Sequence, residues 1–375
     1  MADVFFMDLT ATSRENLPRK LTRLVKEAGL ESVLHPDNLT AVKIHFGEKG
    51  NTSYIRPVFI RNIIQVIKTF KAAPFLTDAN TLYVGTRCNG VSHIHTAIEN
   101  GFSYSSMDQT PILITDGLRG KNETPVVIKR KHCHTVFIGS EVIDANAIVS
   151  VAHFKGHELS GFGGTLKNLG MGCASRRGKL DIHSNVSPKI KRKTCIGCGE
   201  CAKYCPGSAI SLEGKKAFVD TATCIGCAEC IVRCPTHSIN IKWNQTAPVF
   251  LEKMMEYTLG VLMNKAGKAF FINFITEVAP KCDCLPYSES PIVSNIGVVA
   301  SKDPVAIDQA SADLVNQEKA LPGSVLQTNL EPGEDKFKGL YPSVNWQHQL
   351  DYAEKLGLGS RTYTLKKIST LTFKK

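Results

Sequence analysis

The stretch "AIVSVAHFKGHELSGFGGTLKNLG", residues 147–170, decides the fold of this chain. It opens with an unbroken run of small and β-branched residues (147–152), which predicts a buried strand. Three glycines, Gly161, Gly163 and Gly164, then lead into "TLKNLG" (165–170), a short helix-like segment. A buried strand that feeds a glycine-rich turn and a helix is typical of α/β proteins, whose ligands bind at the carboxyl ends of the strands.

The same alternation of strands and helices extends along most of the chain. "RPVFIRNIIQVIKTF" (56–70) places apolar residues three and four positions apart, as one face of a helix does. Strands are predicted at 4–9, 40–46, 73–78, 111–116, 135–139, 147–152, 268–275 and 292–300. Helices are predicted at 14–29, 57–71, 89–100, 248–264 and 304–317, the last with Asp303 as N-cap before Pro304. The pattern predicts an α/β fold with mostly parallel sheets and flanking helices.

The composition excludes several classes of protein. Of 375 residues, 43% are hydrophobic and 21% charged, an ordinary balance for a soluble globular chain. Apolar runs stop short of the roughly 20 residues of a membrane helix, and the N-terminal segment lacks the features of a signal peptide. We therefore expect a cytoplasmic protein without membrane contact. The net charge of +11 comes without an RNA- or DNA-binding signature, so we expect no nucleic-acid partner.

Eight of the 13 cysteines form two runs of identical spacing. "CIGCGECAKYCP" (195–206) and "CIGCAECIVRCP" (224–235) both follow C-x2-C-x2-C-x3-C-P, the spacing of bacterial two-cluster ferredoxins. Three thiolates on one loop hold three corners of a [4Fe-4S] cluster, and the fourth cysteine, expected to start a helix, reaches the other cluster. The predicted ligands are Cys195, Cys198, Cys201 and Cys234 for one cluster, and Cys224, Cys227, Cys230 and Cys205 for the second.

Zinc is the alternative for any pair of CxxC motifs, but the duplicated register and the proline after each fourth cysteine favour iron–sulfur clusters. With about −2 on each cluster and its ligands, the net charge falls to about +7. The motifs interrupt the α/β pattern, which predicts an α/β body over 1–187 and 243–375 and a small ferredoxin-like α+β insert over 188–242. The basic run "PKIKRKTC" (188–195) is either a solvated linker or a docking surface for an acidic redox partner protein.

Side chains that carry chemistry gather after the strand at 147–152. His157, Lys167 and His183 are the candidate catalytic residues, and the turn at Gly163 and Gly164 offers helix N-terminal N–H groups to an anionic ligand. Further candidates for binding an anionic substrate or cofactor are Lys43, His45, Arg56, Asp78, Asn80, Arg87 and Arg176. The spacing matches neither a Walker loop nor a dinucleotide fingerprint. Taken singly, each of these side chains is also compatible with a structural role.

A second cysteine group lies outside the two motifs. "CDC" places Cys282 and Cys284 on a loop after the strand at 268–275. Our hypothesis is that they converge with Cys173, and with His183, on a third metal or redox centre. The alternative is that they are structural thiols.

The motifs now described resemble those of the DUF362 family, uncharacterised proteins often fused to ferredoxin modules. The resemblance rests on residues 41–57, 77–87, 153–184, 282–284 and 296–314. A more distant likeness concerns the nickel-pincer lactate racemase family, in which a catalytic histidine precedes a cofactor-carrying lysine and a nickel-binding histidine. His157, Lys167 and His183 are similar in order and spacing, although "MGCASRRGK" (171–179) departs from that family. The likeness implies a related two-domain α/β body with a cofactor cleft.

These observations lead to three functional hypotheses. The favoured one is an oxidoreductase, in which electrons enter through two [4Fe-4S] clusters and reach a substrate or further cofactor in the α/β body, with His157 or His183 as general acid. The second is a non-enzymatic electron carrier or adaptor for a partner oxidoreductase. The third is a cofactor-dependent isomerase or racemase. We favour the first because a carrier needs no loop of histidine, lysine and cysteine.

Overall fold

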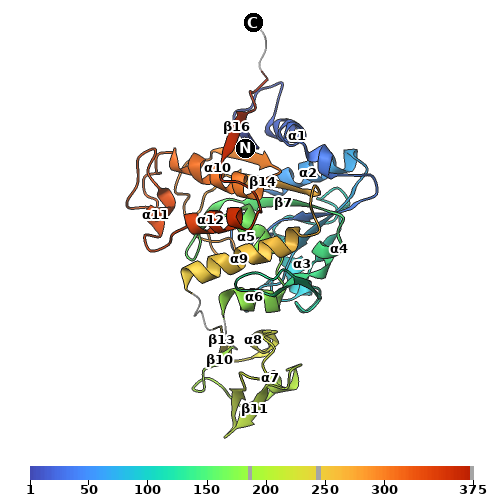
Figure 1. Cartoon of the computed structure of the whole chain (residues 1–375), viewed down its shortest axis with the longest axis vertical. Helices are drawn as coiled ribbons and strands as arrows, with labels where there is room; N and C mark the ends of the chain where they lie inside the picture. The colour runs from blue at the N-terminus through green and yellow to red at the C-terminus, as the bar shows by residue number, and fades with distance from the viewer. Residues whose placement is uncertain (185–187, 242–245, 372–375) are drawn as a thin grey trace.

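The computed structural model describes residues 1–184, 188–241 and 246–371, and its body is built on one eight-stranded sheet (Figure 1). The strand order is β16-β1-β15-β14-β7-β2-β3-β4. In chain order the strands are β1 (Ala2–Asp8), β2 (Leu39–Lys43), β3 (Ala73–Asp78), β4 (Ile112–Ile114), β7 (Ala147–His153), β14 (Ala269–Ile275), β15 (Gly297–Ser301) and β16 (Tyr363–Lys367). Only β15 runs antiparallel to its two neighbours, and all other adjacent pairs are parallel. The predicted α/β fold with a mostly parallel sheet is confirmed.

Helices cover both faces of this sheet, because successive strand residues point to opposite sides. Ile148 packs into one core and Val149 into the other. On one face lie α1 (Leu17–Glu27), α2 (Pro57–Thr69) and α3 (Gly90–Glu99). On the other lie α5 (Thr165–Gly170), α9 (Ala247–Leu262), α10 (Pro304–Asn316) and α12 (Gln347–Lys355). A sheet sandwiched in this way hides its central strands from water, as parallel sheets require.

The stretch that opens at residue 147 forms the centre of the fold. All seven residues of β7 are buried between β14 and β2. A small hairpin of β8 (Lys155–His157) and β9 (Gly161–Gly163) follows, and then α5 and α6 (Arg176–His183). Gly161 has φ +77, and a Cβ there would lie 2.5 Å from the Cβ of Trp346, so this turn requires glycine.

Several expectations about the elements are corrected. The strand at 135–139 forms as β6 (Thr135–Gly139), but it pairs with β5 (Glu123–Val127) in a separate hairpin. Of the predicted strand at 292–300 only the second half is extended, and β16 was not predicted. The body helices not predicted from the sequence are η1 (Leu30–Val33), α4 (Ser140–Asp144), α6, α11 (Lys336–Leu340) and α12.

Residues 188–241 form a lobe of their own below α6 (Figure 1). Its elements are β10 (Lys189–Ile190), α7 (Glu200–Lys203), β11 (Ile210–Glu213), β12 (Lys216–Val219), α8 (Glu229–Arg233) and β13 (Ile239–Asn240). We refer to this lobe as the insert. Cys205 and Cys234 follow the short helices α7 and α8, so the expectation that each fourth cysteine starts a helix was wrong. The turns at Pro206 and Pro235 then lead the chain away.

The insert contacts the body through an apolar cluster and through ion pairs of Glu229, one of which is with Lys121 Nζ at 3.7 Å. Leu82 and Leu180 of the body belong to the same apolar cluster as Cys195, Cys201 and Ile231 of the insert. Beside them the carboxylate of Glu229 on α8 lies 3.2 Å from Nη1 of Arg176, the first residue of α6, and each of the two side chains is only 1% exposed. Since a buried charge is costly without its partner, this pair anchors the insert in one position.

Candidate functional site

A cavity of about 620 Å³ lies at the carboxyl ends of β2, β3 and β7. Lys43, Asp78 and His153, the last residues of these three strands, all line it. The hairpin β8–β9, the helices α5 and α6 and the 282–286 loop complete the wall. The volume is that of a small-molecule pocket, and its position is the one that a parallel sheet offers to ligands. We call this cavity the pocket.

The pocket brings together most of the predicted site residues. Those that line it are Lys43, His45, Asp78, Arg87, His157, Gly163, Gly164, Lys167, His183, Cys282 and Cys284. Others lie elsewhere: Arg56 is exposed at the N-cap of α2, Cys173 is buried in the apolar core, and Arg176 contacts the insert. Asn80 is buried and donates to Asp116 at 2.7 Å.

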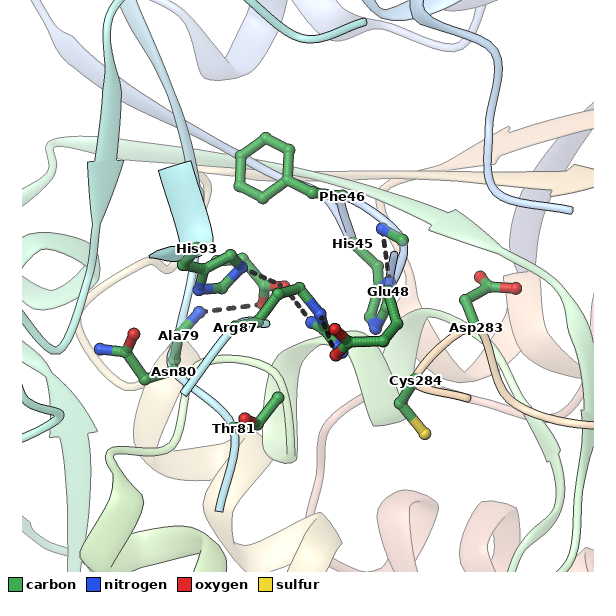
Figure 2. A network of polar contacts seen from close by, with 12 residues as sticks. His45, Phe46, Glu48, Ala79, Asn80, Thr81, Arg87, His93, Asp283 and Cys284 are labelled. Atoms are coloured by element: carbon green, nitrogen blue, oxygen red, sulfur yellow. Dashed lines mark hydrogen bonds and ion pairs between the residues drawn. The ribbon is translucent and has the colours of Figure 1, made fainter. Parts of the chain in front are cut away.

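A network of ion pairs forms one wall of the pocket (Figure 2). Asp78 lies 2.9 Å from Nζ of Lys43 and 3.3 Å from Nη1 of Arg87. Glu48, which the sequence did not single out, accepts from Arg87 Nε at 3.1 Å. Burial alone would raise the pKa of Asp78, but Lys43 and His93 hold it well below its usual range. Because these charges satisfy one another, the wall is rigid rather than reactive.

A second buried carboxylate fixes another part of the pocket wall. Asp283 lies 2.9 Å from both His153 Nδ1 and Lys155 Nζ, and it accepts from Ser53 Oγ at 3.2 Å. The other ring nitrogen of His153 faces the carbonyl oxygens of Thr276 and Glu277, so both nitrogens are positioned as donors. The sequence signal for Asp283 was its place between the two pocket cysteines.

His157 presents one nitrogen to the pocket in a defined protonation state. Its Nδ1 lies 2.9 Å from the Ser160 hydroxyl oxygen and 3.3 Å from the backbone nitrogens of Leu159 and Ser160. Burial, and then the charge of Lys167, hold the pKa of His157 well below its usual range. The ring is therefore neutral, which makes His157 a hydrogen-bonding group for a ligand rather than a cationic acid.

His183 and His45 are also neutral. Burial lowers the pKa of His183 to about 3, helped by Lys167 and Lys179, and its ring stacks on Phe250 at a centroid distance of 5.0 Å. Burial, and then Arg87, hold the pKa of His45 well below its usual range. Neither histidine carries a proton to donate as an imidazolium near pH 7.

The N-terminus of α5 does not offer N–H groups to a ligand, contrary to expectation. The carboxylate of Asp308, on α10, accepts from Thr165 N at 2.7 Å and from Leu166 N at 2.9 Å. A Cβ at Gly164 would lie 2.3 Å from Asp308 Oδ1, so the glycine is needed for this close approach. The glycine-rich turn therefore positions Lys167 in the pocket and leaves the binding of anions to side chains.

Replacing Asp308 with alanine is expected to destabilise the body by about 3 kcal/mol, because it leaves buried N–H groups without acceptors. Asn273 Nδ2 loses a partner as well, at 2.8 Å. Denaturant unfolding of the native protein measures the change. The comparison variant is Asp303→Ala, which removes the half-buried cap of α10 and is expected to cost about 1 kcal/mol. Equal costs would show that Asp308 is not the main cap of α5.

Two lysines supply positive charge that no carboxylate neutralises. Lys167 Nζ lies 3.5 Å from Cys282 Sγ, and Lys179 Nζ donates to Ala174 O at 2.5 Å. Within the described ranges neither lysine has an ion pair with Asp or Glu. Burial lowers the pKa of Lys179 to about 8, while Asp116 and Asp78 oppose this shift. The two ammonium groups favour an anionic ligand.

Lys179 should titrate near pH 8 in the native protein. Its charged form predominates below that pH, so the affinity for an anionic ligand is expected to fall about tenfold as pH rises through 8. Competitive acylation followed by peptide mass spectrometry measures the titration of Lys179 without any ligand. The fall in affinity can be measured as soon as a ligand has been identified. Lys49→Gln is the matched control, because Lys49 also lines the pocket but is exposed and pairs with Glu99 at 3.1 Å. A transition that is absent near pH 8, or lost in the control, would contradict the assignment.

The eight motif cysteines fall into two groups in the insert. One small cavity is lined by Cys195, Cys198, Cys201 and Cys234, and another by Cys205, Cys224, Cys227 and Cys230. Sulfur atoms in both groups accept backbone N–H groups, as from Ala217 to Cys195 at 3.5 Å and from Ala209 to Cys205 at 3.3 Å. This donor set, four thiols around a cavity with N–H groups to the sulfurs, fits a [4Fe-4S] cluster in each place.

A single metal ion has no comparable site. Across the described ranges, no three side chains of His, Cys, Asp or Glu gather around one point. This finding agrees with the assignment of clusters to the eight motif cysteines. In a [4Fe-4S] cluster each thiolate binds a different iron atom, so the four sulfur atoms surround a cavity and do not meet at one point. For the suggested third centre, the structure places Cys282 and Cys284 on the pocket wall and Cys173 in the core, where its Sγ contacts Asn168 O at 4.0 Å.

Comparisons with known proteins agree with the motifs. The family model described as "Domain of unknown function (DUF362)" matches residues 40–313. The chain belongs to the DUF362 family. No curated protein matches it. In the described part of this DUF362 protein, no helix is both long and apolar enough to cross a membrane.

Solved structures resemble this DUF362 protein only distantly. One is the lactate racemase apoprotein from Thermoanaerobacterium thermosaccharolyticum, at 13% identity and a TM-score of 0.35, covering 72% of this chain and 50% of that one. Another is a protein from Thermotoga maritima, at 9% identity and a TM-score of 0.42, covering 92% of this chain and 60% of that one. The DUF362 chain thus spans only half to three fifths of these structures.

Proposed function

We propose that this DUF362 protein is an iron–sulfur oxidoreductase that reduces a small anionic substrate in the pocket. Two [4Fe-4S] clusters in the insert would supply electrons one at a time, taken from an external one-electron donor protein. The observation that carries the proposal is the sorting of the motif cysteines into two groups of four, on a lobe that packs against Leu82 of the pocket wall.

The contact between insert and body supports a short path for electrons. Glu229, which binds Arg176, also lines the cavity of Cys224, Cys227 and Cys230. Leu82 packs in the apolar cluster of the insert and lines the pocket as well. Leu82 therefore belongs both to the pocket wall and to the apolar cluster that contains Cys205 and Cys230 of the second group.

The residues of the pocket divide the remaining work between them. Lys167 and Lys179 attract a negative charge, and neutral His157 forms a hydrogen bond that orients the ligand. The ion-paired walls around Asp78 and Asp283 hold these groups in place. A simple electron carrier needs no cavity of this size beside its clusters, so the pocket favours an enzyme over an adaptor.

The test is to reduce the native protein anaerobically and follow its reoxidation by a panel of small anionic two-electron acceptors, through the cluster absorbance. We expect at least one class of acceptor to reoxidise the protein with saturation, and the rate at low acceptor concentration to fall about tenfold in His157→Gln. Lys49→Gln serves as the matched control at the exposed rim. Reoxidation that never saturates and is equal in all three proteins would identify a carrier.

A cofactor-dependent isomerase is the second candidate, because His157, Lys167 and His183 line one pocket. Mass spectrometry of protein purified from cells distinguishes the two. A covalent adduct on Lys167 would favour the isomerase, whereas an unmodified lysine beside Cys282 agrees with the oxidoreductase.

A further inference from the structure

Two thiols share one wall of the pocket. Cys282 is 2% exposed and Cys284 half-buried, and both line the cavity. The residue between them, Asp283, turns its carboxylate away toward His153 and Lys155. Figure 2 shows the Asp283 carboxylate and the Cys284 thiol leaving the loop in different directions. The loop thus presents both sulfur atoms to the ligand space.

Hydrogen bonds hold this loop in place. The backbone N–H of Glu48 donates to Asp283 O at 3.0 Å, and the hydroxyl of Tyr83 donates to Cys284 O at 3.2 Å. Leu285 N donates to Cys282 O at 3.1 Å and closes a turn. With Asp283 fixed by its ion pairs, the two thiols are held in position before any ligand binds.

The surroundings make one thiol of the pair a nucleophile. A hydrogen bond from Cys284 holds the pKa of Cys282 well below its usual range, against the effect of burial, and Lys167 and Lys155 add to it. The same hydrogen bond, together with burial, raises the pKa of Cys284. Lys167 Nζ lies 3.5 Å from the Cys282 sulfur. Cys282 is the thiolate and Cys284 the proton-bearing partner.

Two other roles for the pair fit less well. A metal centre lacks further ligands, since no third side chain of His, Cys, Asp or Glu joins the two sulfurs among the described residues. Purely structural thiols have no need of a cavity or of a lysine beside the sulfur. Two adjacent thiols, one activated and one held back, have the arrangement of a dithiol that exchanges with disulfides.

We propose that Cys282 and Cys284 form a redox-active dithiol that reduces a small anionic disulfide bound in the pocket. The proposal rests on the proposed function, which it deepens by naming the substrate class. The Cys282 thiolate attacks one sulfur of the substrate, forms a mixed disulfide and releases the first thiolate. Cys284 then attacks Cys282, releases the second thiolate and closes a Cys282–Cys284 disulfide.

The balance of electrons and protons is simple. The substrate disulfide gains two electrons from the two cysteines and leaves as two thiols, taking one proton from Cys284 and one from water. The Cys282 thiolate and the Cys284 thiol are restored by two electrons, which arrive singly by way of the insert from a reduced one-electron donor protein, and by one proton from water, which returns to Cys284. The cations Lys167 and Lys179 select an anionic disulfide.

The experiment uses the native holoprotein under anaerobic conditions, with dithiobis(nitrobenzoate) as the anionic disulfide probe. Lys281 and Lys302 allow trypsin to release residues 282–302, which contain Cys282 and Cys284 and no other cysteine. After reaction with the probe, we expect the mass of this peptide to fall by that of two hydrogens, because a Cys282–Cys284 disulfide has formed. A photoreduced one-electron donor protein should then restore the original mass. In Cys284→Ser the probe should remain attached to Cys282. Lys167→Met should slow the first step at least about tenfold near pH 7, and Lys167→Arg should restore it.

The possible outcomes distinguish the dithiol from the electron path of the proposed function. A peptide that stays reduced, or that carries a separate probe on each cysteine, overturns the dithiol. A disulfide that forms, and that a small dithiol but not the one-electron donor reduces, upholds the dithiol and overturns the electron path of the proposed function. Restoration by the donor that is lost in Cys227→Ala upholds both.

Discussion

Replacing Cys234 with alanine is expected to remove the iron–sulfur cluster of the first cysteine motif and to leave that of its own motif in place. Cys234 lines the cavity of Cys195, Cys198 and Cys201, although it follows Cys230 in the sequence. The iron content should therefore fall from about eight to about four atoms per chain. The remaining signal in electron paramagnetic resonance should match that of Cys198→Ala, and Cys205→Ala should match Cys227→Ala instead.

The two pairs of variants should differ in function as well. The cavity of Cys205 and Cys227 adjoins Glu229 and hence the body, so losing its cluster should abolish electron delivery to the pocket. Cys88→Ala is the control, because this half-buried cysteine lies outside both motifs and should leave about eight iron atoms. If Cys234→Ala instead lost the same signal as Cys227→Ala, the assignment of ligands would be wrong.

Glu229→Gln is expected to loosen the insert from the body and to slow electron delivery. The substitution leaves Arg176 buried without its carboxylate, and breaking a buried ion pair from one side costs about 3 kcal/mol. The carbonyl oxygens that also accept from Arg176, such as Arg119 O at 2.6 Å, satisfy hydrogen bonds but carry no full charge. Hydrogen exchange of residues 188–241 in the native protein measures the loosening, and reoxidation by a pocket acceptor measures the rate.

Because the cysteine motif occurs twice in the chain, the first copy provides a matched control for this variant. Glu200 is the equivalent of Glu229 in the first motif, and it makes no ion pair in the part of the chain that the structure describes. Glu200→Gln should therefore change stability by no more than about 0.5 kcal/mol and leave the rate unchanged. Equal effects of the two substitutions would show that the Arg176 contact does not anchor the insert.

The strands of the central sheet were predictable from the sequence wherever burial on both faces produces a mostly apolar run of residues. β7 and β14 are buried on both faces, and their mostly apolar runs, each with a single polar residue before the strand end (Ser150 and Asn273), predicted them. The run at 135–139 has the same appearance, but it forms a hairpin outside the sheet, because a short apolar run does not specify its partner. The direction of β15 depends on pairing with β1 and β14, which no local pattern encodes.

The candidate site shows the same limit. Lys43 lies in one predicted strand, and His157 and Lys167 follow another, so their meeting at one edge of a parallel sheet was predictable from topology. Asp308 was not, because it reaches α5 from a helix more than a hundred residues away and occupies the N–H groups expected to bind a ligand. Arg176 was expected near the ligand and lies against the insert instead, since only the packed structure reveals the carboxylate that it meets.

Metal and sulfide analysis of the anaerobically purified protein, combined with electron paramagnetic resonance after reduction, tests the account most directly. The account predicts about eight iron and eight sulfide atoms per chain and the signals of two neighbouring [4Fe-4S] clusters. It predicts further that a small anionic disulfide removes these signals while each disulfide consumed is recovered as two thiols. Zinc in place of iron, or cluster signals that persist while the disulfide is consumed, would contradict it.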